Sequence, residues 1–175
     1  MSRLVRHALP TDLEALVALE DRAFSGDRFS RRQLWHLLNR ANAHTLVVEA
    51  QGSLLGYGTL LMRRNSSLAR LYSLCVAPEA RGSGLGRELL ARLESDSRAL
   101  GLDRMALEVR ADNRRAMRLY RQAGFRLVGW LDEYYEDGCA AWRMLKVLDA
   151  APGGEASQGA REARRNEAPK AASCW

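Results

Sequence analysis

A glycine-rich turn is the segment of this sequence whose composition most favours binding chemistry. Gly82, Gly84 and Gly86 stand between Arg81 and Arg87, after a strand-like run and at the start of a helix-like run. The first turn of a helix presents unpaired N–H groups and the positive end of the helix dipole, and phosphate groups bind there. A tight loop also uses glycines, but a glycine inside the first helical turn costs about 1 kcal/mol relative to alanine. Close approach of a ligand to the backbone would account for that cost.

Two familiar nucleotide-binding motifs do not fit this turn. The dinucleotide fingerprint requires Gly-x-Gly-x-x-Gly, whereas residues 82–87 read Gly-Ser-Gly-Leu-Gly-Arg. The P-loop requires Gly-Lys followed by Ser or Thr, and here Gly86 is followed by Arg87 and Glu88. The sequence therefore predicts a phosphate-binding turn of another kind.

Two titratable side chains further along the chain could transfer protons. In the strand-like run from Arg104 to Arg110, Glu108 falls on the face opposite the larger apolar residues. A carboxylate that faces a cleft could accept a proton, or it could form an ion pair with Arg110 or another arginine. Tyr120 follows on a predicted helix, where its phenol could donate a proton or could simply pack in the core.

These residues depend on strands and helices that alternate along residues 1–148. The apolar periodicity predicts strands near residues 3–8, 45–50, 54–62, 68–76, 104–110, 125–131 and 139–147, and helices near 11–24, 30–38, 84–100 and 113–123. The pattern predicts an α/β fold, a mixed sheet with helices on its faces, centred on the strand–helix–strand unit from residue 68 to 110. Residues 149–175 lack larger aliphatic side chains over most of their length, and we expect a disordered tail there.

The composition limits the class of protein. The net charge of +6 lies entirely on residues 1–148 and fits an anionic ligand or nucleic acid. The chain has no apolar run of about 18 residues and no signal-peptide pattern, so we expect a cytoplasmic protein without a membrane partner. Cys75, Cys139 and Cys174 are interpreted as reduced thiols.

Several segments together resemble one superfamily. Arg81–Gly86 matches the Arg/Gln-x-x-Gly-x-Gly/Ala motif of the GNAT N-acetyltransferases. Leu71–Pro78 is similar to the strand before that motif, and Leu107–Asn113 and Ala116–Phe125 are similar to the later strand and helix. Within the superfamily, the later segments most resemble the bacterial ribosomal-protein alanine N-acetyltransferases.

Two segments depart from that narrower group. Residues 24–29 lack its Pro-Trp pair, and Asp132 and Glu133, rather than basic residues, precede Tyr134 and Tyr135. Both segments would shape the acceptor side of the site, so the identity of the acceptor stays open.

The resemblance implies a fold, a reaction and a set of site residues. The fold would be a mostly antiparallel sheet of about six to seven strands, with a splayed parallel pair at the cofactor site. The reaction would move the acetyl group of acetyl-CoA directly to a primary amine, with Glu108 as base, directly or through water, and Tyr120 as the acid that protonates the leaving thiolate. Asn113 would contact the cofactor, although its position also suits a helix N-cap. The remaining cofactor-binding positions, with no metal, would be Leu74, Cys75 and Val76, whose N–H groups polarise the thioester carbonyl, and Arg81, Gly82, Ser83, Gly84, Leu85, Gly86 and Arg87.

Three functions remain open from the sequence. The acceptor could be a protein N-terminus, such as that of a ribosomal protein, or a small amine such as an amino acid, a polyamine or an antibiotic. The basic net charge argues against cationic polyamines. The chain could instead be a non-catalytic basic module, supported by Arg63-Arg64 and Arg114-Arg115, although no nucleic-acid motif accompanies these pairs.

Five aromatic residues could line a groove for the acceptor or could simply pack in the core: Phe24, Phe29, Trp35, Tyr134 and Tyr135.

Overall fold

A mixed β-sheet forms the centre of the molecule. The computed structural model describes residues 2–40, 42–149 and 173–174. Their elements are β1 (Leu4–His7), α1 (Leu13–Ala23), α2 (Arg31–Asn39), β2 (Ala43–Ala50), β3 (Ser53–Met62), β4 (Leu68–Val76), α3 (Leu85–Ala99), β5 (Arg104–Arg110), α4 (Arg114–Gln122), β6 (Arg126–Leu131), β7 (Ala141–Val147) and β8 (Ser173–Cys174), with short 3-10 turns at Pro10–Asp12 and Pro78–Ala80. The strand order is β1-β2-β3-β4-β5-β7-β6, and β8 pairs with β4. The α/β fold and the parallel β4–β5 pair predicted from the sequence are confirmed.

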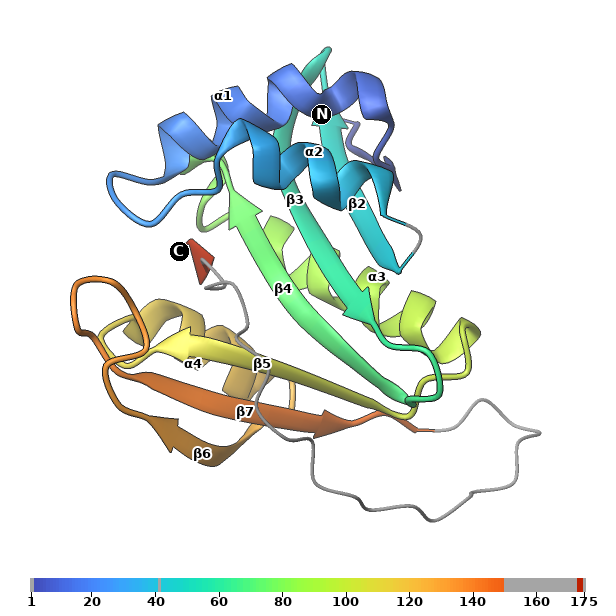
Figure 1. Ribbon diagram of the computed structural model, residues 1–175. Coiled ribbons are helices and arrows are strands. Elements are labelled where there is room, and N and C mark those ends of the chain that lie inside the picture. The colour runs from blue at the N-terminus through green and yellow to red at the C-terminus, as the bar shows by residue number, and fades with distance from the viewer. Residues whose placement is uncertain (1, 41, 150–172, 175) are drawn as a thin grey trace.

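Helices cover both faces of the sheet. Figure 1 shows α1 and α2 in front of the sheet and α3 and α4 behind it. Leucines of α1 and α3 are almost completely buried against the strands, which agrees with the apolar stripes in the sequence. None of the helices among the described residues is long and apolar enough to cross a bilayer.

Two glycines of β3 let α3 lie close to the sheet. A Cβ atom on Gly56 would lie 2.8 Å from the carbonyl oxygen of Cys75 and 2.9 Å from Leu85 Cδ2. A Cβ atom on Gly58 would lie 2.7 Å from Leu93 Cδ1. Since real Cβ atoms do not approach other atoms this closely, the missing side chains fix where α3 begins relative to β4.

The central strand β4 changes partners along its length. Its pairing with β3 skips Tyr72, so that residue is the extra residue of a β-bulge. Its parallel pairing with β5 covers only Leu68–Arg70 opposite Arg104–Ala106. Beyond these positions the two strands no longer pair, and Figure 1 shows them diverging toward their carboxyl ends. We call the region beside the β4 edge that β5 leaves unpaired the opening.

A short strand occupies this opening. Ser173 and Cys174 form β8, which pairs in parallel with Leu74 and Cys75 of β4. The disordered tail expected for residues 149–175 lies outside the described residues, apart from Asp149 and this strand. The pattern of the sequence does not predict the pairing, since an Ala-rich run with one Ser and one Cys has no strand periodicity.

Candidate active site

The glycine turn adopts the backbone conformation that its composition suggests. Gly82 and Gly84 have φ angles of +77° and +82°, in the left-handed region that other residues rarely adopt. A Cβ atom at either position would meet nothing within 4 Å, so these glycines are not required by packing inside the protein. Gly84 is the N-cap of α3 and supplies no side chain to cap the helix. The first turn of α3 is therefore open to an external acceptor such as phosphate.

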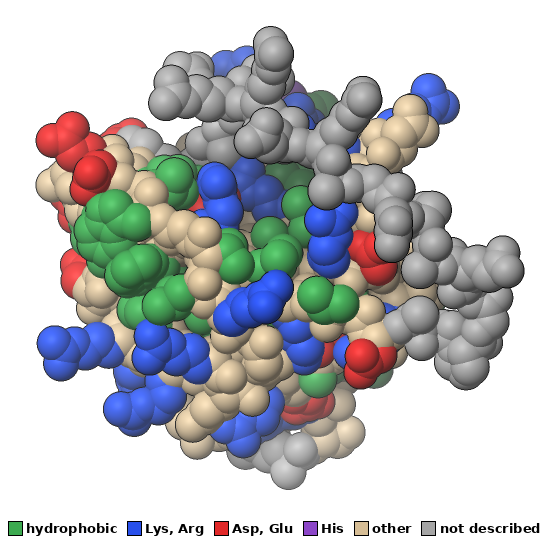
Figure 2. Space-filling model, turned by 90° about the horizontal axis from the view of Figure 1, so that it is seen from below, with side chains coloured by type: hydrophobic (Ala, Val, Ile, Leu, Met, Phe, Trp, Pro, Cys, Tyr) green, Lys and Arg blue, Asp and Glu red, His purple; other side chains and the backbone are tan. Residues whose placement is uncertain are grey.

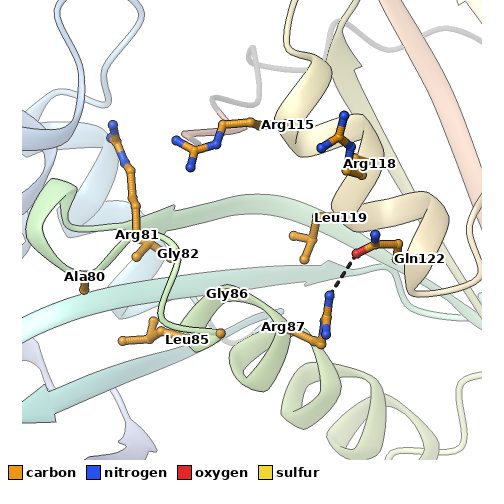
Figure 3. A pocket seen from close by; sticks show the side chains of 12 residues that line it. Ala80, Arg81, Gly82, Leu85, Gly86, Arg87, Arg115, Arg118, Leu119 and Gln122 are labelled. Carbon is orange, nitrogen blue, oxygen red and sulfur yellow. Dashed lines mark hydrogen bonds between the residues drawn. The ribbon is translucent and has the colours of Figure 1, made fainter.

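A basic cavity adjoins this turn. It has a volume of about 340 Å³ and lies between the end of β4, the start of α3 and one face of α4. Arg115 and Arg118 reach it from α4, and Arg87 reaches it from α3 while donating a hydrogen bond of 2.8 Å to Gln122 (Figure 3). Arginines gathered around a glycine turn fit a polyanionic ligand with a pyrophosphate group.

Two of these arginines were not selected as site residues from the sequence. Arg115 and Arg118 are three residues apart, a spacing that places both on the same face of a helix. That spacing could have indicated a shared ligand once the helix was placed beside the glycine turn.

Arg81 connects the glycine turn to α1, because its Nη2 donates a hydrogen bond to the carbonyl of Ala23 at 3.1 Å.

The buried end of β4 lies beside the cavity. Leu74, Cys75 and Val76 are at most 1% exposed, and Val76 also lines the cavity. Their edge faces the opening that β5 leaves, where β8 pairs with the first two of them. Cys75 is completely buried and packs in the hydrophobic core.

Glu108 is held by two arginines at the opening between β4 and β5. Its Oε2 accepts from Arg70 Nη2 at 2.9 Å and from Arg70 Nε at 3.2 Å, while its Oε1 lies 3.4 Å from Arg143 Nη2. Arg70 Nη2 also lies 3.3 Å from the hydroxyl of Tyr134. The ion pair expected as the alternative role of Glu108 therefore exists, with Arg70 and Arg143 as its partners rather than Arg110.

Arg110 instead joins the two loops that flank the carboxyl end of β5. It donates to Asp27 in the α1–α2 loop at 2.9 Å and to Asp137 in the β6–β7 loop at 2.6 Å and 3.2 Å. It also contacts Asp112, and its guanidinium lowers the pKa of both Asp112 and Asp137. Its guanidinium carbon lies 4.7 Å from the ring centre of Tyr135. Sequence reasoning did not identify this role for Arg110.

Two buried tyrosines lie close to each other, and one of them, Tyr135, also lies within electrostatic range of Glu108. Tyr120 is fully buried, and its ring makes an edge contact with Phe125 at 5.8 Å. Tyr135 is 3% exposed, and its hydroxyl has no hydrogen-bond partner within the described part of the chain. Burial raises the pKa of Tyr135, so its phenol is neutral.

Asn113 and three aromatic residues have structural roles. Asn113 is the N-cap of α4, with its Oδ1 accepting from the Ala116 N–H at 3.1 Å, so the N-cap alternative is confirmed. Phe29 is buried and stacks on Tyr72 at the bulge, with 5.1 Å between ring centres. Phe24 packs at the edge of the core, whereas Trp35 is 48% exposed and contacts His36.

A buried carboxyl group supports the α1–α2 loop. Glu20 is 1% exposed, accepts from the Phe29 N–H at 2.9 Å and accepts a short hydrogen bond from the Tyr57 hydroxyl. Burial raises the pKa of Glu20 to about 7. Its spacing of four residues from Leu16 places it on the buried stripe of α1, which is the sequence signal that could have identified it.

No metal site is evident among the described residues. Nowhere within residues 2–40, 42–149 and 173–174 do three or more His, Cys, Asp or Glu side chains form a cluster that could hold an ion. The polar chemistry at the opening is that of Glu108, Tyr134 and arginines.

The sequence of this chain matches a known protein family. Residues 13–125 match the model of the acetyltransferase (GNAT) family. The chain belongs to that family. It is therefore an acetyltransferase of the GNAT type, as the motifs from Leu71 to Phe125 indicate, and family membership favours an enzyme over a non-catalytic basic module.

Relatives of this GNAT chain include protein N-terminal acetyltransferases. The N-alpha-acetyltransferase RimI of Mycobacterium tuberculosis is 32% identical over 144 residues, which cover 77% of this chain and 86% of that protein. The crystal structure of ribosomal-protein-alanine N-acetyltransferase from Brucella melitensis is 30% identical, with a TM-score of 0.71 over 83% of this chain and 99% of that one. The ribosomal-protein-S18-alanine N-acetyltransferase of Escherichia coli shows the same fold, with a TM-score of 0.79, 24% identity and coverage of 89% and 100%.

Proposed function

We propose that this GNAT chain transfers the acetyl group of acetyl-CoA to the N-terminal α-amine of a protein. The observation that carries the proposal is the position of Glu108, a buried carboxylate at the opening between β4 and β5, on the strand pair whose β4 member ends at the basic cavity through Val76. The relatives named as N-alpha- and ribosomal-protein-alanine N-acetyltransferases support a protein N-terminus as the acceptor.

The cofactor half of the site follows from charge and backbone geometry. The open first turn of α3 suits the pyrophosphate of acetyl-CoA, and Arg87, Arg115 and Arg118 complement its phosphates. Acetyl-CoA supplies an activated acetyl group on a thioester. Backbone N–H groups alternate between the two edges of a strand, so only those in Leu74–Val76 that do not face β3 would polarise a carbonyl oxygen at the opening.

The proton transfers would fall to Glu108 and Tyr120. Glu108 Oε2 is engaged by Arg70, whereas within the described part of the chain Oε1 has only the longer 3.4 Å contact with Arg143. Oε1 is therefore the oxygen available to take a proton from the attacking amine, directly or through water. As the new C–N bond forms and the C–S bond breaks, the phenol of Tyr120 would give its proton to the leaving sulfur.

The acceptor half would lie between the α1–α2 and β6–β7 loops. The latter is acidic, and its acidic residues are Asp132, Glu133, Glu136 and Asp137. A negative rim would attract a protonated N-terminus even though the whole chain is basic. On the face in Figure 2, basic side chains are scattered among acidic and hydrophobic ones, which does not favour a continuous nucleic-acid track.

An acceptor panel tests the proposal. The full chain is incubated with acetyl-CoA and three acceptors: peptides with a free N-terminus, the same peptides with a blocked N-terminus and an internal lysine, and small amines. CoA release and the mass of each acceptor are measured. We expect turnover on the free N-terminus alone. Turnover on small amines alone would instead support the small-molecule alternative, and equal turnover on free and blocked peptides would contradict the proposal.

A further inference from the structure

The β4 edge at the opening already holds an extended segment of this chain. Ser173 pairs with Leu74 and Cys174 with Cys75, in parallel register. In Figure 1 the short red strand β8 lies in the gap between β4 and β5, at the end where those strands diverge. The parallel pairing of β4 with β5 ends at Arg70, so β8 pairs with a part of the β4 edge that β5 leaves unpaired.

This location coincides with the path that the proposed cofactor needs. The basic cavity is lined by Val76, the residue directly after the β8 pairing. A molecule with its pyrophosphate at the turn and its thioester near Glu108 must pass along Leu74 and Cys75. The arm of acetyl-CoA is an extended chain with two amide groups, so it would seek the same backbone N–H and C=O groups that a β-strand seeks.

We infer that residues 173–174 and the arm of acetyl-CoA compete for the edge of β4, so the chain carries its own reversible inhibitor of cofactor binding. The inference rests on the proposed function, because it needs acetyl-CoA to use this opening. The backbone groups at Leu74 and Cys75 can pair with one occupant at a time. Binding of acetyl-CoA therefore requires β8 to leave, and the segment lowers the apparent affinity without touching the phosphate-binding turn.

The size of the effect follows from the fraction of molecules with an open edge. If β8 is docked in about four of five molecules, the apparent Kd for acetyl-CoA rises about fivefold over that of the open form. The nucleotide end of CoA alone, adenosine 3′-phosphate 5′-diphosphate, carries the pyrophosphate but not the arm. Its affinity should not depend on β8.

Variants of residues 173 and 174 in the full chain distinguish the effect of the backbone pairing from the effect of the two side chains. The double variant Ser173→Pro/Cys174→Pro removes both N–H groups, which a strand needs for its ladder. The matched control Ser173→Ala/Cys174→Ala removes the same hydroxyl and thiol and keeps both N–H groups. Isothermal titration with acetyl-CoA and with adenosine 3′-phosphate 5′-diphosphate gives two affinities for each variant.

We expect the proline variant to bind acetyl-CoA about fivefold more tightly than the alanine variant and the nucleotide equally well. Hydrogen exchange supplies a second measurement. Amides of residues 71–76 should exchange faster in the ligand-free proline variant than in the alanine variant, and acetyl-CoA should protect them in both.

Two outcomes would overturn the inference while leaving the proposed function intact: equal acetyl-CoA affinity in the two variants, or an equal gain for the nucleotide. If neither variant nor the unaltered chain binds acetyl-CoA, the proposed function fails, and this inference fails with it.

Discussion

Arg70 and Glu108 face each other at the last pairing between β4 and β5, joined by contacts of 2.9 and 3.2 Å to one carboxylate oxygen. Arg70 is the final β4 residue in the parallel ladder, and Glu108 lies two residues beyond the final β5 residue, Ala106. The ion pair therefore spans the point at which the strands separate. It holds the proposed base at the opening while leaving its second oxygen less engaged.

Replacement of Glu108 tests the base. Glu108→Gln keeps the shape of the side chain but cannot accept a proton from an ammonium. We expect kcat to fall by about 100-fold, with the Kd for acetyl-CoA within about twofold of the unaltered chain. Steady-state kinetics and titration measure the two quantities. Full turnover at neutral pH in the Gln variant would rule out Glu108 as the base.

Two buried tyrosines give a matched pair for the acid. Tyr120→Phe should lower kcat by about 10- to 100-fold, because the leaving sulfur loses its proton donor. Tyr135→Phe should keep kcat, and it should raise the free energy of unfolding by about 1 kcal/mol, because it removes a buried hydroxyl without a hydrogen-bond partner among the described residues. Kinetics and urea denaturation of both variants test this contrast. Equal losses of kcat would argue against a specific role for Tyr120.

The ends of α3 provide a control for the glycine turn. Gly84 and Gly101 have φ angles of +82° and +78°, and a Cβ atom on either would meet nothing within 4 Å. Gly84→Glu and Gly101→Glu should therefore cause similar backbone strain of about 1–2 kcal/mol. Only Gly84→Glu should abolish acetyl-CoA binding, since its carboxylate would meet the pyrophosphate. Titration checks this, and comparable losses in both variants would show that strain alone is responsible.

The basic face of α4 should contribute through charge. The double variant Arg115→Ala/Arg118→Ala is expected to weaken acetyl-CoA binding about tenfold at low salt, and the difference should shrink as salt is raised. Arg121→Ala, on the same helix but outside the cavity lining, should bind acetyl-CoA normally. Titrations at two ionic strengths distinguish the variants, and a salt-independent loss would contradict an electrostatic role.

Glu20 should make stability depend on pH. Its pKa is raised from 4.5 to about 7 by burial, so the folded chain binds more protons than the unfolded chain between these values. This contribution is fully present below pH 4.5, falls as pH rises and is lost above about pH 7, a change of about 3 kcal/mol. Glu20→Gln should remove that fall, whereas Glu14→Gln, on the exposed side of α1, should retain it. Urea denaturation at pH 5 and pH 8 tests the difference, and a fall that persists in Glu20→Gln would assign it to other groups.

The sequence predicted what depends on local pattern. The glycine turn, the order of strands and helices and the N-cap at Asn113 follow from backbone conformation and apolar periodicity, which act within a few residues. The partners of Glu108 could not be derived from the sequence. Arg70 and Arg143 lie 38 and 35 residues from Glu108 along the chain, and only the pairing of their strands with β5 brings them to it. Residues 173–174 were even harder to place, since their position depends on an unfilled edge of β4 rather than on their own side chains.

The contacts of Arg110 limit how the set of amines that this enzyme accepts can change. One guanidinium binds Asp27 and Asp137, which lie in the two loops where this sequence departs from the family group that it most resembles. A substitution that removes either aspartate leaves the other with an altered charge balance. Variation in the two loops should therefore be correlated among homologues, and efforts to redirect the enzyme to a new amine would have to redesign both loops together.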